Sequence, residues 1–108
     1  MIKQNSSFIH QTKGEEMTVT LLGDIDHHSA VDLRRDLDRL LYAERPLRLT
    51  LDLSSVEFMD SSGLGLILGR YTKLSTLGGK LVVTRPTPEI RKLLQLAGAD
   101  KLFPIEEK

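Results

Sequence analysis

A carboxylate followed by two hydroxyl side chains, Asp60, Ser61 and Ser62, stands at the predicted start of a helix. Any of these three side chains could accept a hydrogen bond from the free backbone N–H groups of the first turn. A phosphate on Ser61 would meet the same N–H groups and the positive end of the helix dipole, so the fold should tolerate it. On spacing alone, a serine that only caps the helix is the favoured interpretation.

A phosphate on Ser61 would change the surface charge without unfolding the domain. It would add a charge of roughly −1.5 to −2 beside Asp60. If an acidic group of a partner protein lay about 6 Å away, each unit of charge would cost about 2–3 kcal/mol at an effective dielectric constant near 20. Because this cost corresponds to roughly a hundredfold loss of affinity, the segment is a candidate switch for protein docking.

Enzymatic interpretations of the same segment have less support. It does not match the G-x-S-x-G nucleophile elbow, because Met59 stands two residues before Ser61, and no histidine follows Ser61 to complete a hydrolase triad in the usual order. Gly63, Gly65 and Gly69 miss the G-x-G-x-x-G spacing, and the lysine of a phosphate-binding loop is absent. We therefore expect no enzymatic activity. A nucleotide-binding protein is the alternative that the glycine-rich loop supports.

Two adjacent histidines, His27 and His28, stand beside Asp24 and Asp26, and this composition could suggest a metal site. Adjacent histidines rarely converge on one ion without preorganised geometry, so roles in the loop or the helix cap are favoured. We expect neither a metal nor a cofactor.

Composition bounds the class of protein. The 108 residues suffice for one hydrophobic core, so we expect one domain over residues 1–108. Fifteen basic and 15 acidic residues balance, so no positive field favours nucleic acid or an anionic membrane as a partner. Cysteine is absent, and no apolar run reaches the roughly 18 residues of a membrane span. We expect a cytoplasmic protein.

Hydrophobic periodicity predicts an α/β domain that begins with a β-hairpin. The predicted strands cover residues 7–12, 17–23, 47–53, 80–84 and 102–105, and the predicted helices cover 29–42, 61–77 and a third segment that Thr87 and Pro88 open and Gly98 ends. The order β-β-α-β-α-β-α-β indicates a mixed sheet. Apolar and polar residues alternate in 47–53, which favours helices packed mainly on one face. Arg34 and Asp38 form a predicted stabilising pair on the first helix.

The second helix has one predicted core face and one predicted outer face. The core face contains Leu64, Ile67, Leu68, Tyr71 and Leu74, and the outer face contains Leu66, Gly69, Lys73 and Thr76. A glycine inside a helix costs about 0.5–1 kcal/mol relative to alanine, so Gly65 and Gly69 need an explanation. Close approach by another protein surface is one.

Two segments, DIDHHSA at residues 24–30 and FMDSSGLG at residues 58–65 followed by ILGRY at 67–71, resemble the anti-sigma factor antagonists of the STAS domain family. The likeness extends over nearly the whole chain and is strongest to the antagonists that act on the anti-sigma F factor of spore-forming bacteria. It implies a single STAS domain. Members of the family usually continue past the last strand into a further helix, whereas this sequence reaches Lys108 shortly after Pro104 and Ile105.

The resemblance implies a partner-switching role in the control of sporulation transcription. In that family the unmodified protein binds an anti-sigma factor that is also a serine kinase, and so frees the sigma factor. The kinase uses ATP to phosphorylate the first serine after the aspartate, here Ser61, and a metal-dependent phosphatase of the PP2C type removes the phosphate. The free protein is expected to be a monomer. A STAS module in another circuit, such as the general stress response, is the alternative.

The resemblance also implies which residues contact the kinase. Asp24, on the loop before the first helix, should lie near Ser61, and the surface around both should meet the partner. The expected partner-binding residues are Asp24, Asp60, Ser62, Gly63, Leu64, Leu66, Gly69 and Lys73.

Overall fold

A five-stranded sheet in the order β1-β2-β3-β4-β5 forms the centre of the computed structural model, which describes residues 8–107. Its strands are β1 (Phe8–Lys13), β2 (Glu16–Leu21), β3 (Arg48–Asp52), β4 (Lys80–Thr84) and β5 (Ile105–Glu106). The helices are α1 (His27–Glu44), α2 (Ser61–Thr76), α3 (Pro88–Leu96) and the 3-10 turn η1 (Ala99–Lys101). The first residue of the predicted strand 7–12 lies outside the described residues.

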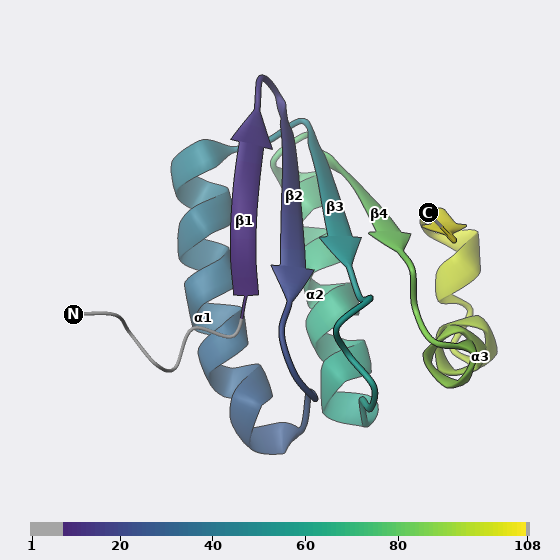
Figure 1. Cartoon of the computed structure of the whole chain (residues 1–108). Helices are drawn as coiled ribbons and strands as arrows, with labels where there is room; N and C mark the ends of the chain where they lie inside the picture. Colours follow the sequence, from purple (N-terminus) through teal and green to yellow (C-terminus); the bar gives the residue numbers. More distant parts are fainter. Residues whose placement is uncertain (1–7, 108) are drawn as a thin grey trace.

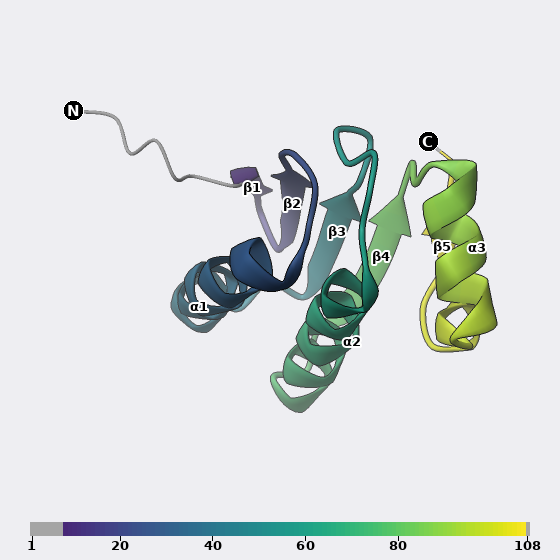
Figure 2. The same cartoon turned by 90° about the horizontal axis from the view of Figure 1, so that it is seen from below.

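The sheet is mixed, as the sequence predicts. β1 and β2 form an antiparallel hairpin, and β2, β3, β4 and β5 run parallel to one another. Helices α1 and α2 lie side by side on one face of the sheet, and α3 lies beyond β4 at the edge where β5 pairs (Figures 1 and 2). The predicted placement of the helices mainly on one face is therefore confirmed.

The core lies between the sheet and helices α1 and α2. Alternate strand residues point into it: Met17, Val19 and Leu21 from β2, Leu49 and Leu51 from β3, and Leu81 and Val83 from β4. The helices contribute Leu33, Leu37 and Leu41 from α1 and Ile67 and Leu74 from α2. Because strand side chains alternate between faces, the period of two read in residues 47–53 correctly predicted which face of β3 is buried.

Local capping chemistry sets the helix starts. Asp26 caps α1: its Oδ1 accepts hydrogen bonds from the N–H groups of His28 and Ser29, each at 2.9 Å, and the Ser29 hydroxyl accepts one from the Asp26 N–H. This capping box starts α1 two residues before the predicted start at residue 29. The prediction for α3 is confirmed, since Thr87 caps it and Pro88 is its first residue.

The last strand differs from the prediction. Strand β5 covers Ile105–Glu106 rather than residues 102–105. The turn η1 places Phe103 in the core, where its ring centroid lies 5.6 Å from that of Tyr71. The apolar side chains at 102–105 thus reflect packing of an irregular segment, which resembles a short buried strand in sequence.

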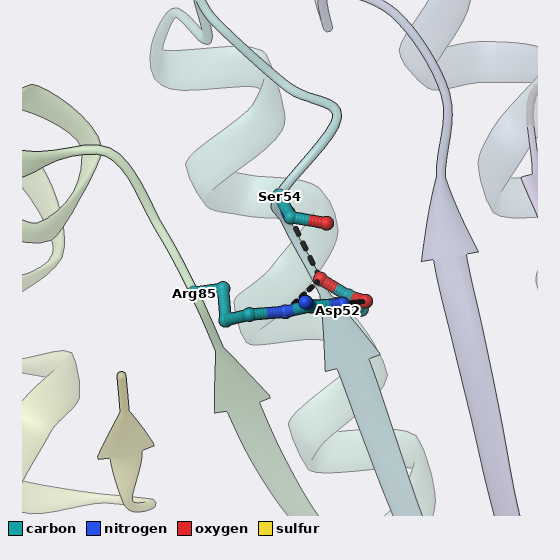
Figure 3. Close-up of polar contacts among 3 residues, drawn as sticks. All are labelled: Asp52, Ser54 and Arg85. Atoms are coloured by element: carbon teal, nitrogen blue, oxygen red, sulfur yellow. Dashed lines mark hydrogen bonds and ion pairs between the residues drawn. The ribbon is translucent and has the colours of Figure 1, made fainter. Parts of the chain in front are cut away.

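A polar clamp on the sheet face opposite α1 and α2 ties the ends of β3 and β4 together. Asp52 is buried, and its carboxylate accepts hydrogen bonds from the Arg85 guanidinium and from the Ser54 N–H, the latter at 2.9 Å (Figure 3). Burial alone would raise the pKa of Asp52, but the hydrogen bonds from Arg85 and Ser54 outweigh it and hold this pKa below its usual value. The clamp anchors the start of the loop that leads to α2.

Candidate functional site at the start of helix α2

Two loops meet at the edge of the sheet where β2 and β3 end. The strands are parallel neighbours, so their carboxyl ends lie together, and the loop after β2 runs alongside the loop after β3. Backbone hydrogen bonds join them: Ile25 N–H donates to Phe58 O at 3.0 Å and Asp60 N–H donates to Ile25 O at 3.2 Å. The segment directly before Ser61 is therefore held against the loop that carries Asp24.

Asp24 is an exposed residue that links these two loops. Its Oδ1 accepts a hydrogen bond from the Phe58 N–H at 3.1 Å, three residues before Ser61. The isolated bridge between Ile25 and Met59 fixes the same contact. Asp24 thus has a structural role in the loop besides the partner contact that the sequence predicts for it.

Asp60 is the N-cap of α2, and Ser61 is the first residue of the helix. The Asp60 Oδ1 accepts a hydrogen bond from the Ser62 N–H at 2.8 Å, and the Asp60 carbonyl accepts from Gly63 and Leu64. Ser61 is exposed, and its hydroxyl makes no hydrogen bond to another residue in the range 8–107. The interpretation in which Ser61 serves only as the helix cap is wrong, because Asp60 fills that position.

The glycines of α2 fall into two kinds. Gly63 is buried, and a Cβ built on it would lie 2.1 Å from Met59 Cγ and 3.2 Å from Ile25 Cγ2. Gly65 is exposed and Gly69 half-buried, and a Cβ on either would meet nothing within 4 Å. Packing inside the chain therefore explains Gly63 but neither Gly65 nor Gly69.

Leu66 corrects the helical-wheel prediction of an outward side chain. It is only 5% exposed and belongs to the core cluster. Helical periodicity predicts one buried stripe, whereas α2 is covered by the sheet on one side and by α1 on another (Figure 2). Of the other predicted outer residues, Gly69 and Lys73 are half-buried and Thr76 is exposed.

Lys73 and Leu64 border the candidate surface on different sides of α2. The Lys73 ammonium lies 5.5 Å from the centroid of the Tyr42 ring on α1, within the range of a cation–π contact. Leu64 is half-buried and packs against the core, so only part of its side chain is accessible to a partner. Among the predicted partner-binding residues, Asp24 is the one that is exposed, and the others are half-buried or buried.

The predicted pair of Arg34 and Asp38 is also corrected. Asp38 instead faces Arg70 of α2, whose Nε lies 3.0 Å from the Asp38 Oδ1. Burial lowers the pKa of Arg70; Arg34 lowers it further, and Asp38 opposes both. Asp38 thus pairs between helices α1 and α2 and not within α1, and residue spacing within α1 cannot predict such a contact.

Two exposed apolar side chains in these loops were not predicted as site residues from the sequence. Phe58 is 55% exposed and Leu22 is 39% exposed, and they occupy the two loops joined by the Ile25–Phe58 hydrogen bond. The sequence signal for Phe58 was its position, since it is an aromatic residue two positions before the Asp60 cap. Large apolar side chains on an exposed surface are frequent in protein interfaces.

The described part of the chain offers few other chemical sites. Residues 8–107 contain no group of three or more His, Cys, Asp and Glu side chains placed to hold a metal ion. His27 and His28 are the first two residues of α1, with ring centroids 5.8 Å apart. No helix in the described range is long and apolar enough to cross a membrane.

The class of protein follows from the sheet topology, from the two joined loops and from the exposed Ser61 that follows the Asp60 cap. The STAS domain family matches residues 7–108, and the chain belongs to that family. The chain is similar to the protein named anti-sigma F factor antagonist of Paenibacillus polymyxa, with 37% identity over 89 residues that cover 82% of this chain and 76% of the relative. The predicted resemblance to the anti-sigma factor antagonists of this family is confirmed.

Further relatives and solved structures agree. The anti-sigma-B factor antagonist of Bacillus subtilis is 30% identical over 107 residues, covering 99% of this chain and 89% of the relative. The structure of the anti-sigma factor antagonist SpoIIAA in its unphosphorylated form superposes with a TM-score of 0.81 at 26% identity, covering 94% of this chain and 88% of that one. SpoIIAA of Bacillus has also been solved in the phosphorylated form, with a TM-score of 0.75 at 26% identity, covering 94% of this chain and 91% of that one.

Proposed function

We propose that this chain is an anti-anti-sigma factor controlled by phosphorylation of Ser61. Its unphosphorylated form binds an anti-sigma factor that is also a serine kinase, and this binding releases the sigma factor. Phosphorylation by the kinase stops the binding, and a phosphatase of the PP2C type restores it. The protein acts in the cytoplasm, as a regulator rather than an enzyme.

One observation carries the proposal: Ser61 is exposed in the first turn of α2 while Asp60 caps the helix. A kinase can reach this hydroxyl, and modifying it removes no hydrogen bond that holds the helix start. The phosphate would lie at the positive end of the helix dipole, which favours a negative charge by about 0.3–1 kcal/mol. Repulsion from Asp60 opposes this gain, so folding should change little.

The glycines on the outer side of α2 support a docking surface beside Ser61. Gly65 and Gly69 each lower helix stability by about 0.5–1 kcal/mol relative to alanine, and no contact within residues 8–107 explains why glycine is needed at either position. A partner whose backbone approaches the helix closely would explain it, because a side chain there would block the approach. Asp24, Asp60 and Ser62 would surround the approach, with Leu64 and Lys73 at its border.

Gly63 and Leu66 have indirect roles in this proposal. Gly63 lets α2 pack against Met59, which precedes the Asp60 cap, and Leu66 holds α2 against α1. Both residues would shape the docking surface from beneath it. Phe58, exposed on the adjoining loop, adds an apolar contact that the sequence did not predict.

Sporulation is the pathway we propose, with the general stress response as the second candidate. The likeness to the antagonist named for the anti-sigma F factor supports the first, and the likeness to the anti-sigma-B factor antagonist supports the second. Binding measured in parallel to a purified kinase of each type, from the same organism, separates them. The preferred partner should bind at least about tenfold more tightly, a difference of about 1.4 kcal/mol.

The switch itself is tested with two substitutions at Ser61. Ser61→Ala should bind the kinase as the unmodified protein does, because the hydroxyl makes no internal hydrogen bond in the described structure. Ser61→Asp should bind roughly a hundredfold more weakly, since it places a permanent charge beside Asp60. Equal affinity of the two variants for the kinase in isothermal titration calorimetry would contradict the charge mechanism.

A further inference from the structure

A groove of about 380 Å³ runs between α1 and α2, next to the Ser61 turn. Its α1 wall consists of His27, Ala30, Val31 and Arg34, and its α2 wall consists of Ser62, Gly65 and Leu66. Ser62 belongs both to this groove and to the first turn of α2, so the groove continues the candidate docking surface onto α1. Nothing in the role proposed for Ser61 accounts for the α1 side of the groove.

The walls combine apolar surface with an accessible backbone. Val31 is 50% exposed and offers apolar surface on the α1 side, and Leu66 is buried beneath the groove. Gly65 has no side chain, so it leaves the backbone open on part of the α2 wall, where a Cβ would meet nothing within 4 Å. A side chain of another protein could therefore enter between the helices.

The charge of the groove is positive. Arg34 is the charged residue of its lining, and no carboxylate belongs to the lining. Three acids of α1 are paired with other arginines: Asp32 and Asp36 with Arg35, and Asp38 with Arg70.

Asp38 is paired with Arg70 and not with Arg34. Arg70 is 4% exposed and its Nη1 has no hydrogen-bond partner within residues 8–107, so this guanidinium is poorly compensated. The like charge of Arg34 contributes to lowering the pKa of Arg70, after burial and against the effect of Asp38. Arg34 makes no ion pair in the described structure, so no carboxylate compensates its positive charge there.

We propose that the groove receives an acidic side chain and its apolar neighbour from the kinase partner, with Arg34 binding the carboxylate and Val31 contacting the apolar group. The inference rests on the proposed function and deepens it. An arginine binds a carboxylate through two parallel hydrogen bonds, and arginine is enriched at protein interfaces. The lone guanidinium in an apolar groove fits one acidic side chain, and its position beside Ser62 assigns that side chain to the protein docked at Ser61.

The partner carboxylate that Arg34 binds is also the group that a phosphate on Ser61 would repel. A partner acid held by Arg34 would lie along the α2 wall, where Ser62 and Gly65 flank it. A phosphate on Ser61, one residue before Ser62, would place negative charge beside that acid. Arg34 in the groove would thus attract the partner carboxylate, and the phosphate on Ser61 would repel the same carboxylate.

The test compares Arg34→Gln with the matched control Arg35→Gln. Both arginines are exposed on α1, but Arg35 pairs with Asp32 and Asp36 and does not line the groove. Titration calorimetry with a purified anti-sigma kinase from the same organism should give a loss of about 10- to 100-fold for Arg34→Gln and less than about threefold for Arg35→Gln. The loss should shrink as ionic strength rises. Unchanged circular dichroism and melting temperature establish that both variants are folded.

A double-variant cycle tests the link to Ser61. If Arg34 holds the acid that a charge at position 61 repels, Ser61→Asp should weaken binding much less in an Arg34→Gln background than in the wild type. Val31→Ser should weaken binding as well, because it removes the apolar contact. Additive effects of Ser61→Asp and Arg34→Gln would contradict the shared carboxylate.

Failure of this inference can be distinguished from failure of the proposed function. If the wild type and Ser61→Ala bind the kinase, Ser61→Asp does not, and Arg34→Gln binds as the wild type does, the groove proposal alone is overturned. If Arg34→Glu changes self-association in sedimentation equilibrium but leaves kinase binding intact, the occupant is a second copy and the proposal is wrong. A groove that binds inorganic phosphate in NMR titration, while Arg34→Gln leaves kinase affinity unchanged, also overturns it.

Discussion

Gly63→Ala should destabilise the protein although it replaces a helical glycine with the best helix former. The added Cβ would lie 2.1 Å from Met59 Cγ, 2.8 Å from Met59 Sδ and 3.2 Å from Ile25 Cγ2. Carbon atoms in contact prefer about 3.5–4.0 Å, so Met59 must move by more than about 1 Å. Met59 is 5% exposed and Ile25 is 1% exposed, so little free space is available for that movement.

The expected magnitude is the difference between two effects. Overpacking of a filled core costs about 1–3 kcal/mol. Alanine in place of glycine returns about 0.5–1 kcal/mol in helix propensity. We expect a net loss of about 1–2 kcal/mol in the free energy of unfolding, which corresponds to a fall in melting temperature of roughly 4–16 °C for a domain of this size.

Gly65→Ala is the matched control for this prediction. Its Cβ would meet nothing within 4 Å, so it should gain the helix propensity alone and stabilise the protein by about 0.5–1 kcal/mol. Urea unfolding followed by circular dichroism measures both variants. In a Met59→Ala background, which removes the clashing atoms, Gly63→Ala should no longer destabilise. Stabilisation by Gly63→Ala in the wild type would refute the packing argument.

Two further predictions concern the core and the polar clamp. Leu66→Ala should lower the free energy of unfolding by about 2–4 kcal/mol because Leu66 is buried between α1 and α2, whereas Leu96→Ala, at a residue 78% exposed, should change it by less than about 0.5 kcal/mol in the same urea experiment. Asp52→Asn should cost about 1 kcal/mol at pH 7, since it removes the charge that Arg85 and the Ser54 N–H stabilise. The folded-state pKa of Asp52 lies below the usual 3.8, so this cost should stay constant above about pH 4 and shrink as the pH falls through the pKa of Asp52. A cost that grows between pH 4 and pH 3 would contradict the sign of this shift.

Signals within a few residues of one another predicted the fold and the start of α2. Alternation in residues 47–53 gave the buried face of β3, the Thr87 and Pro88 pair gave the start of α3, and Asp60 was recognised as a possible cap beside Ser61. These features depend on backbone hydrogen bonding and local periodicity, which a short stretch of sequence encodes directly.

The errors have a common physical origin in contacts between distant segments. Leu66 was placed outward because its burial depends on α1, more than 20 residues earlier in the chain. Asp38 pairs with Arg70 of another helix rather than with Arg34 one turn away. The exposed Phe58 became a candidate contact only when the loop after β2 was seen to lie beside it. Periodicity within one element cannot report such packing.

The central claim is that a phosphate on Ser61 abolishes docking of a folded protein. The most direct measurement is incubation with ATP and the purified anti-sigma kinase, mass spectrometry to locate the phosphate, and calorimetric titration of the kinase with both separated forms. Our account predicts a single phosphate on Ser61, a melting temperature that changes by less than about 8 °C, and an affinity reduced by roughly a hundredfold or more. A phosphate on another residue, or a phosphorylated Ser61 that binds the kinase as tightly as the free hydroxyl does, would contradict it.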